Sequence, residues 1–192
     1  MEDIMKKSLG AHTYLPTTPV LLVGTYDQQG KPNMMTAAWG GICCSKPPCV
    51  AVSLRKATYS YSAIIERKAF TIGVPMESQI EEADYLGLVS GRKVDKFAEI
   101  GFSAVKSDLV DAPYAEELPF IIECNLLESI ELGLHTLFVG EIVDVKADEK
   151  VLAEDGLPDI TKVKPFIFDP IHQGYIGLGS FLGKAFSVGK RK

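Results

Sequence analysis

Short apolar runs separated by turn residues dominate the first half of the chain. The runs have the length and β-branched content of strands, and clusters of glycine, proline, asparagine and aspartate interrupt them. Residues 27–30 read as a hairpin turn, and Pro47-Pro48 separates two further runs. The strands expected here cover residues 20–26, 33–39, 49–54 and 69–74.

Helical spacing appears between these strands and two longer ones. Residues 58–66 predict a short helix with threonine or serine at its start, and residues 77–86 a second helix with Ile80, Ala83 and Leu86 on one face. The polar loop 90–97 leads into a third short helix that stops near Gly101. Residues 119–131 and 134–145 predict long strands joined at Gly133, whereas 165–179 has no clear period.

Strands outnumber helices in this pattern, and hairpin-like joins connect them. We therefore predict a mainly β fold with flanking helices, built as a closed or half-closed antiparallel barrel. The 192 residues fit one domain spanning 1–192.

Composition and charge narrow the class of protein. The chain is 46% hydrophobic and 23% charged, as in globular proteins, and its net charge of −5 argues against nucleic-acid binding. The basic end at 190–192 is expected to be a solvated tail. No apolar run is long enough to span a membrane, and residues 1–7 do not resemble a signal peptide, so a cytoplasmic location is expected.

The four cysteines do not have the spacing of a metal site. Cys43, Cys44 and Cys49 form a C-C-x4-C pattern with two prolines inside it, and Cys124 is distant, whereas zinc or iron–sulfur sites favour C-x2-C hairpins. A bond between adjacent Cys43 and Cys44 would be strained, because neighbouring Cα atoms lie about 3.8 Å apart. We expect buried free thiols.

Most catalytic motifs are missing from the sequence. The three histidines, His12, His135 and His172, form no zinc-binding pair, and there is no G-x-S-x-G elbow. The glycine-rich segment 177–184 does not match a phosphate loop. We therefore predict no metal and no catalytic side chain, and a cofactor would carry any reaction.

One segment has the composition of an anion site. Strand 49–54 runs through Ser53 into Arg55 and Lys56, and hydroxyls follow at Thr58 and Ser60 where a helix should begin. Arg55 could fork onto phosphate oxygens, with Lys56 as a point charge and the hydroxyls as donors. A capped surface helix beside a solvated basic turn is the alternative.

The strand at 33–39 could border a flat ligand. Thr36, Ala37 and Ala38 are small enough for a ring to approach the backbone, and Met34 and Trp39 could wall it. A close-packed barrel core is the alternative explanation of the same residues.

Several motifs in one order resemble those of the flavin reductase-like FMN-binding proteins, most closely the flavoredoxin branch. They are PVLLVGTYD, GKPNMMTAAWGGICCS, PPCVAVSLR, ADYLG and LHTLFVGEI, and the similarity runs from about Lys6 to the C-terminus. The resemblance implies a split β-barrel, a homodimer and non-covalent FMN near the subunit interface.

The resemblance also implies roles for individual residues. Asn33 and the strand 36–39 would border the flavin ring, and the anion site would hold its phosphate. The segment with Ser90, Gly91 and Lys96 matches a family loop over the flavin, and His135 matches a family histidine. The full set of implied cofactor-binding residues is Asn33, Met34, Thr36, Ala37, Ala38, Trp39, Ser53, Arg55, Lys56, Thr58, Ser60, Ser90, Gly91, Lys96 and His135.

Three functions are compatible with this sequence. The resemblance favours an FMN-binding oxidoreductase that takes electrons from NADH or NADPH. The first alternative is a non-enzymatic FMN carrier that passes electrons between redox protein partners, and the second is a barrel without a ligand.

Overall fold

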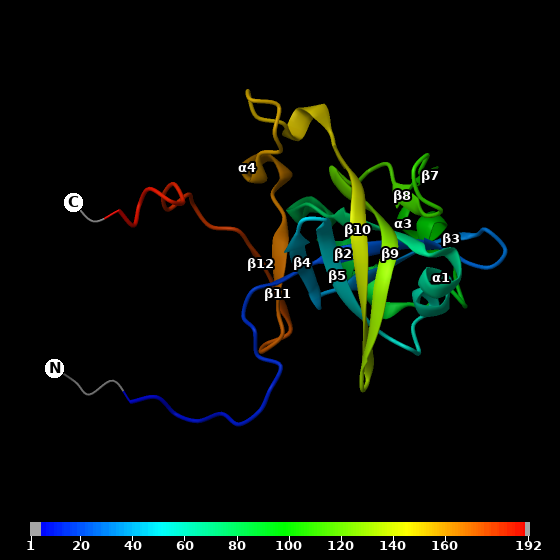
Figure 1. Ribbon diagram of the computed structural model, residues 1–192, viewed down its shortest axis with the longest axis horizontal. Helices are drawn as coiled ribbons and strands as arrows, with labels where there is room; N and C mark the ends of the chain where they lie inside the picture. The colour runs from blue at the N-terminus through cyan, green and yellow to red at the C-terminus, as the bar shows by residue number, and fades with distance from the viewer. Residues whose placement is uncertain (1–4, 191–192) are drawn as a thin grey trace.

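The computed structural model describes residues 5–190, so the predictions for 1–7 and 190–192 fall partly outside the described residues. A seven-stranded antiparallel sheet forms its centre, in the order β3-β2-β6-β9-β10-β5-β4 (Figure 1). In chain order its members are β2 (Leu21–Tyr26), β3 (Pro32–Ala37), β4 (Gly40–Ser45), β5 (Pro48–Arg55), β6 (Ala69–Val74), β9 (Phe120–Leu132) and β10 (His135–Ala147).

Two small sheets and several short helices surround this sheet. The small sheets contain β1 (Thr18–Pro19), β11 (Phe166–Asp169) and β12 (Gly174–Gly177) in one, and β7 (Ala104–Lys106) and β8 (Pro113–Ala115) in the other. The helices are α1 (Tyr59–Arg67), α2 (Ile80–Leu88), α3 (Lys96–Ile100) and α4 (Ile160–Val163), with 3-10 turns at Glu77–Gln79 and Glu149–Val151. None of these described helices is long and apolar enough to cross a membrane.

The large sheet is half-closed. Strands β3 and β4 follow each other in sequence but form its two edges, and no ladder joins them among the described residues. Just before β4, the Trp39 carbonyl accepts a hydrogen bond from the Ser53 N–H of β5 at 2.8 Å, which extends the β4–β5 ladder by one residue. The predicted mainly β, antiparallel fold with flanking helices is therefore confirmed, in its half-closed form.

Strands β2, β3 and β9 contribute to two separate apolar clusters, because successive side chains of a strand point to opposite faces. On β2, Leu21 and Val23 pack with Phe70 and Phe138 in one cluster, while Leu22 packs in the other. Helix α1 contributes to the first cluster. Helices α2 and α3 contribute to the second, which fixes both of them against the outside of the barrel near β3.

Helices α1 to α3 and most strands of the large sheet follow the sequence pattern. The strand β4 was not expected, and neither were β1, β7, β8, β11, β12 and α4. Ile80 is 38% exposed instead of sharing the buried face of Ala83 and Leu86. Thr58 occupies the N-cap of α1, but its hydroxyl donates to the Arg55 carbonyl at 2.9 Å and does not cap the helix. The predicted join at Gly133 is confirmed, and its φ of 66° is a conformation that glycine adopts readily.

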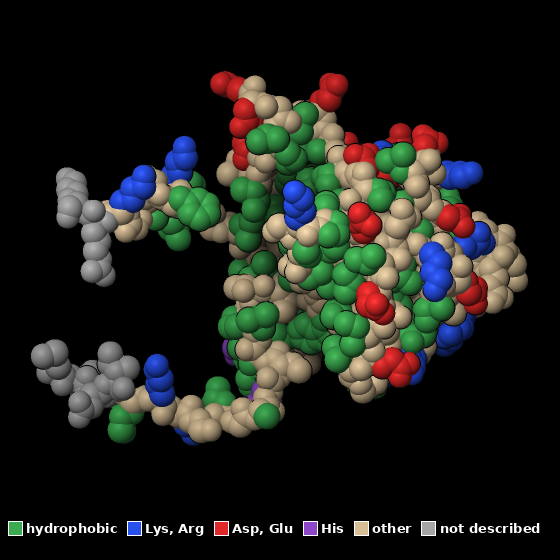
Figure 2. All heavy atoms as spheres, in the orientation of Figure 1, with side chains coloured by type: hydrophobic (Ala, Val, Ile, Leu, Met, Phe, Trp, Pro, Cys, Tyr) green, Lys and Arg blue, Asp and Glu red, His purple; other side chains and the backbone are tan. Residues whose placement is uncertain are grey.

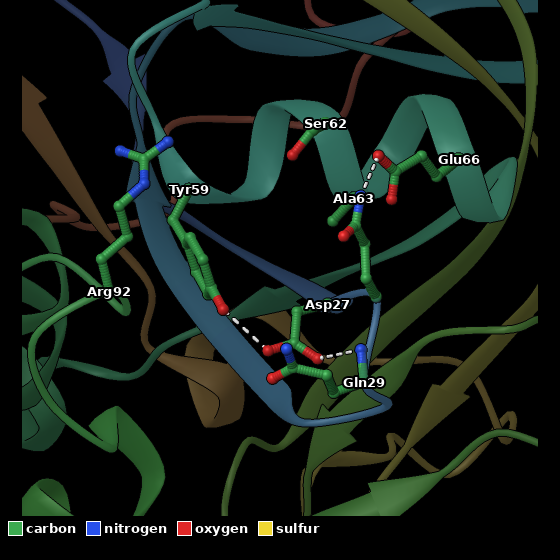
Figure 3. Close-up of a pocket in the computed structure, with 8 residues that line it drawn as sticks. Asp27, Gln29, Tyr59, Ser62, Ala63, Glu66 and Arg92 are labelled. Atoms are coloured by element: carbon green, nitrogen blue, oxygen red, sulfur yellow. Dashed lines mark hydrogen bonds between the residues drawn. The ribbon is translucent and has the colours of Figure 1, made fainter.

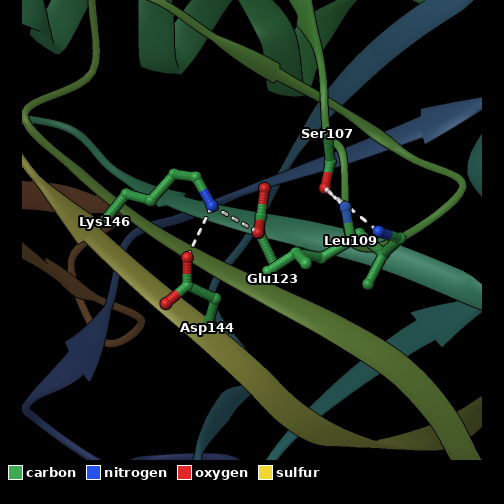
Figure 4. A network of polar contacts seen from close by, with 6 residues as sticks. Ser107, Leu109, Glu123, Asp144 and Lys146 are labelled. Carbon is green, nitrogen blue, oxygen red and sulfur yellow. Dashed lines mark hydrogen bonds and ion pairs between the residues drawn. The ribbon is translucent and has the colours of Figure 1, made fainter.

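One buried carboxylate lies on β9. Glu123 is fully buried, and Lys146 of β10 donates to its Oε2 at 2.6 Å and to Asp144 Oδ2 at 2.6 Å (Figure 4). Glu123 Oε1 has no hydrogen-bond partner among the described residues. Pairing offsets much of the cost of burying this charge, so loss of Lys146 would leave a charge that folding strongly disfavours.

Candidate functional site

A small cavity of about 230 Å³ lies between β3, the start of α1 and the segment that links α2 to α3. Six predicted site residues line it: Asn33, Thr58, Ser60, Ser90, Gly91 and Lys96. Met35, Tyr59 and residues 86–89 complete its walls. The fold therefore brings together residues that are up to 63 positions apart in the sequence, and we call this space the polar cavity.

The side-chain amide of Asn33 lines this polar cavity and has one hydrogen-bonding atom without a partner among the described residues. Asn33 is 3% exposed, and its Nδ2 donates to Ser60 Oγ at 2.9 Å. Asn33 Oδ1 has no hydrogen-bond partner among the described residues. A buried amide oxygen without a partner costs about 1–3 kcal/mol, so the position favours a ligand that donates to it.

Glycine at position 91 lets the loop approach the amide closely. A Cβ at Gly91 would lie 2.2 Å from Asn33 Oδ1 and 2.6 Å from Tyr59 Cδ1. Any other residue would push into both groups and fill the space beside the unpaired oxygen.

Lys96 brings a buried amine to the same polar cavity. Asp95 caps α3 by accepting from the Ala98 N–H, and Phe97 anchors the helix in the second apolar cluster. As a result Lys96 is only 4% exposed, and its Nζ donates to the Leu86 carbonyl at 2.6 Å. Burial lowers the pKa of Lys96 to about 8. The amine still has donors free for an anion.

A larger, more open cavity of about 790 Å³ lies at the other end of β3 and beside β5. Four predicted site residues line it: Ala38, Trp39, Ser53 and His135. Its other walls come from Gly40, Gly41 and Ile42 of β4, from Leu132 and Leu137, and from the segment 12–19. Its volume is typical of small-molecule sites, and its lining is mostly apolar, so we call it the apolar cavity.

The two predicted cations lie at the end of β5 and line neither cavity. Arg55 is exposed and stands opposite His135 in the β5–β10 ladder. Lys56 Nζ forms an ion pair with Glu131 Oε1 at 2.7 Å, and this pair raises the pKa of Lys56. Of the two, Arg55 has no ion-pair partner within residues 5–190.

Three predicted residues of β3 also line neither cavity. Met34 is 1% exposed and packs in the second apolar cluster, whereas Ala37 packs in the first. The Thr36 hydroxyl donates to the Ala83 carbonyl of α2. The close-packed core thus accounts for these positions.

A third cavity, of about 290 Å³, lies beside Tyr59, which also lines the polar cavity (Figure 3). The Tyr59 hydroxyl donates to Asp27 Oδ2 at 2.7 Å, and the Arg92 guanidinium lies 5.6 Å from the ring centroid. The hydrogen bond to Asp27 raises the pKa of Tyr59. Burial acts to raise the pKa of Asp27, but hydrogen bonds from Tyr59, Lys31 and Gln29 lower it. These contacts hold the wall of the polar cavity in place.

Sequence reasoning missed several lining residues. Tyr59 and Met35 wall the polar cavity, and Gly40, Gly41 and Ile42 wall the apolar one. The alternation of 33–39 could have indicated Met35, because Asn33 and Met35 share a face. The sequence carried no comparable indication of β4, because its residues do not alternate between buried and exposed.

The fold is an antiparallel split barrel with two separate cavities beside β3. The model of the family described as "Flavin reductase like domain" matches residues 14–167. This match covers most of the chain, so the chain belongs to the flavin reductase-like family. The resemblance inferred from the sequence is confirmed.

Solved structures and a curated relative agree with this assignment. The chain is similar to flavoredoxin of Desulfovibrio vulgaris (Miyazaki F), with 56% identity, a TM-score of 0.93 and coverage of 97% of this chain and 100% of that one. Flavoredoxin from Methanosarcina acetivorans is 31% identical, with a TM-score of 0.87 and 97% of each chain covered. A ferric-chelate reductase (NAD(P)H) of Archaeoglobus fulgidus is 31% identical over 112 residues, 56% of this chain and 64% of the relative.

Proposed function

We propose that this protein is a cytoplasmic oxidoreductase that binds FMN without a covalent bond. The observation behind this proposal is the pair of cavities at opposite ends of β3, one wide and mostly apolar, the other small and lined by several polar side chains. Ala38, Trp39, Ser53 and His135 would hold the ring. Arg55, Thr58, Ser60 and Lys96 would hold the phosphate end, which a buried amine and hydroxyls suit.

The unpaired Asn33 amide oxygen and the glycine at position 91 fit such a ligand. The amide oxygen could accept a hydrogen bond from a donor group of the bound molecule, and the glycine keeps a side chain away from that oxygen. FMN would supply the redox chemistry, accepting two electrons and passing them on. The chain's own residues bind and orient it, and Lys96 adds positive charge that favours a more anionic ligand.

Absorption spectroscopy tests cofactor binding directly. We expect the protein, after incubation with FMN and dialysis, to keep the visible bands of oxidised flavin in about one equivalent per chain. Protein that stays colourless would instead support the ligand-free barrel.

We propose NADH or NADPH as the electron donor. The ferric-chelate reductase (NAD(P)H) of Archaeoglobus fulgidus supports this choice, because that relative is named for these nucleotides. In stopped-flow mixing, the FMN-loaded protein should lose its flavin absorbance with one of the two nucleotides. Free FMN at the same concentration is the control and should bleach far more slowly.

The second candidate is an electron carrier between protein partners. Ile42 is 68% exposed and Leu132 is 57% exposed at the rim of the apolar cavity, where a protein could dock. Absence of bleaching with both nucleotides, together with bound FMN that a chemical reductant does bleach, would favour this carrier.

We propose that the protein acts as a homodimer. Both terminal segments project away from the barrel on one side (Figure 1), and they carry hydrophobic side chains (Figure 2). Phe181 and Phe186 are 80% and 99% exposed, which is costly in an isolated chain. Light scattering should give twice the mass of one chain. Phe181→Asp with Phe186→Asp should lower it, while Ser180→Asp with Ser187→Asp should not.

A further inference from the structure

Three of the four cysteines lie on one hairpin at the edge of the sheet. Strand β4 is an edge strand, and Cys43 and Cys44 on it are exposed, so the expectation of buried thiols is wrong for these two because an edge strand buries little. Cys49 is buried on the neighbouring strand β5. The proposed flavin chemistry uses none of these thiols, so their arrangement needs its own explanation.

Cys44 and Cys49 stand directly opposite each other in the antiparallel β4–β5 ladder. Opposite residues in such a ladder have Cα atoms about 4.5–5.5 Å apart, with side chains on the same face. This separation falls inside the range of about 4.4–6.8 Å that disulfides span. The ladder therefore places the two residues at a Cα separation that a disulfide can span.

The other pairings of these cysteines are less suitable. A β-bulge separates Ile42 from Cys44 in the ladder, and Cys43 has no opposite residue there. Cys124 lies on β9, and β10 separates β9 from β5, so two strand spacings of about 4.8 Å separate Cys124 from Cys49.

We propose that Cys44 and Cys49 form a reversible cross-strand disulfide in exchange with low-molecular-weight disulfides. The Cys44 thiolate attacks one sulfur of RSSR, forms a Cys44–S–S–R bond and releases RS⁻, which takes up a proton. The Cys49 thiolate then attacks Cys44 Sγ, forms the Cys44–Cys49 bond and releases the second RSH. The two protein thiols are oxidised, and RSSR is reduced to two RSH.

Exposure sets the order of the two attacks. Of the two paired cysteines, exposed Cys44 can meet a disulfide in solution. Cys49 is 2% exposed and can reach only groups beside it, such as Cys44. Burial, followed by the nearby thiols Cys44 and Cys43, raises the pKa of Cys49, so the second step should accelerate in mild alkali.

The bond would join two strands that wall the apolar cavity. Gly40, Gly41 and Ile42 of β4 and Ala51 and Ser53 of β5 line this space, on the same hairpin as the cysteine pair. Oxidation would therefore tie the free edge strand to its neighbour beside the proposed ring site.

The test uses Cys43→Ser as its reference, because exposed Cys43 could carry an adduct of its own. The reduced full-length protein is incubated with oxidised glutathione, then denatured and alkylated, and its intact mass is measured. We expect alkylatable thiols to fall from three to one, with no glutathione retained, and dithiothreitol to restore all three.

Two further variants separate the steps. Cys43→Ser with Cys49→Ala should accumulate one glutathione on Cys44, and Cys43→Ser with Cys44→Ser should keep both remaining thiols free. The proposal is overturned if the Cys43→Ser reference keeps three free thiols, retains glutathione, or forms a disulfide between chains.

Discussion

The two cavities at opposite ends of β3 differ in how their walls are held. Buried and hydrogen-bonded groups of the barrel and helices α1 to α3 wall the polar cavity. The apolar cavity is more than three times larger, and part of its wall is the segment 12–19 outside the barrel. Fixed polar groups bind at low entropic cost, whereas open apolar walls admit other molecules. We therefore expect the polar cavity to dominate FMN affinity and the apolar cavity to govern access.

The largest effect should follow closure of the polar cavity. Gly91→Ala places a methyl group against Asn33 Oδ1 and Tyr59, so FMN binding should weaken by roughly 2–3 kcal/mol. A fluorescence titration with FMN measures the change.

Gly87→Ala is the matched control, because Gly87 lines the same polar cavity. Its Cβ would meet Thr36 at 3.4 Å, an ordinary contact, and alanine suits the helix there. We expect unchanged FMN affinity. Equal losses in both variants would contradict the role given to position 91.

The buried amine of Lys96 should reduce the stability of the ligand-free protein. Its pKa of about 8 in the folded state is below 10.5, the ordinary lysine value. Between these values the folded state binds fewer protons than the unfolded state, so stability rises with pH there. Below pH 8 the full cost remains, roughly 3 kcal/mol.

Lys96→Met removes this cost together with the hydrogen bond to Leu86. We expect a gain of about 1–3 kcal/mol at pH 7 that shrinks as the pH approaches 10.5. Urea unfolding of both proteins at pH 7, 8.5 and 10 measures their unfolding free energies. In the difference between the two proteins, the contributions of all other titrating groups cancel. A difference that does not change with pH would show that Lys96 is not buried as a cation.

Sequence patterns predicted the barrel better than the cavities. Strands β2 and β6 are continuous apolar runs that are buried on both faces, and such runs of strand length bounded by turn residues are recognisable in the sequence. The edge strand β4 escaped this reasoning, since its Gly40-Gly41 pair, its bulge and its exposed cysteines interrupt any such run. Edge strands bury little, so their patterns constrain less.

The sequence indicated many of the residues that line the cavities, but it did not indicate that they divide between two separate cavities. Asn33 and Trp39 were expected to border one ring, yet Asn33 bonds to Ser60 of α1 in the polar cavity and Trp39 lines the apolar one. Long-range packing decides which residues meet, and spacing along the chain does not report it. The burial of Lys96 was equally hidden, because lysine is almost always exposed.

Arg55 should matter more than its neighbour Lys56. Arg55→Ala should weaken FMN binding by roughly 1–3 kcal/mol, the range for charge-assisted hydrogen bonds. Lys56 already pairs with Glu131, so Lys56→Ala should cost less than about 1 kcal/mol. FMN titrations at low and high salt compare the two. If the Arg55→Ala protein keeps wild-type affinity, the phosphate is not held at the end of β5.

The smallest effect on affinity should come from the apolar cavity. His135 contributes one side chain to an open wall, so His135→Ala should weaken FMN binding by only about 0.5–1.5 kcal/mol. The rate of flavin bleaching by the nucleotide donor should change more than the dissociation constant, because this cavity is where a second molecule would enter. Titration and stopped-flow of the same variant separate the two quantities. A loss of affinity as large as that of Gly91→Ala would reverse the comparison and make the open cavity the main source of binding energy.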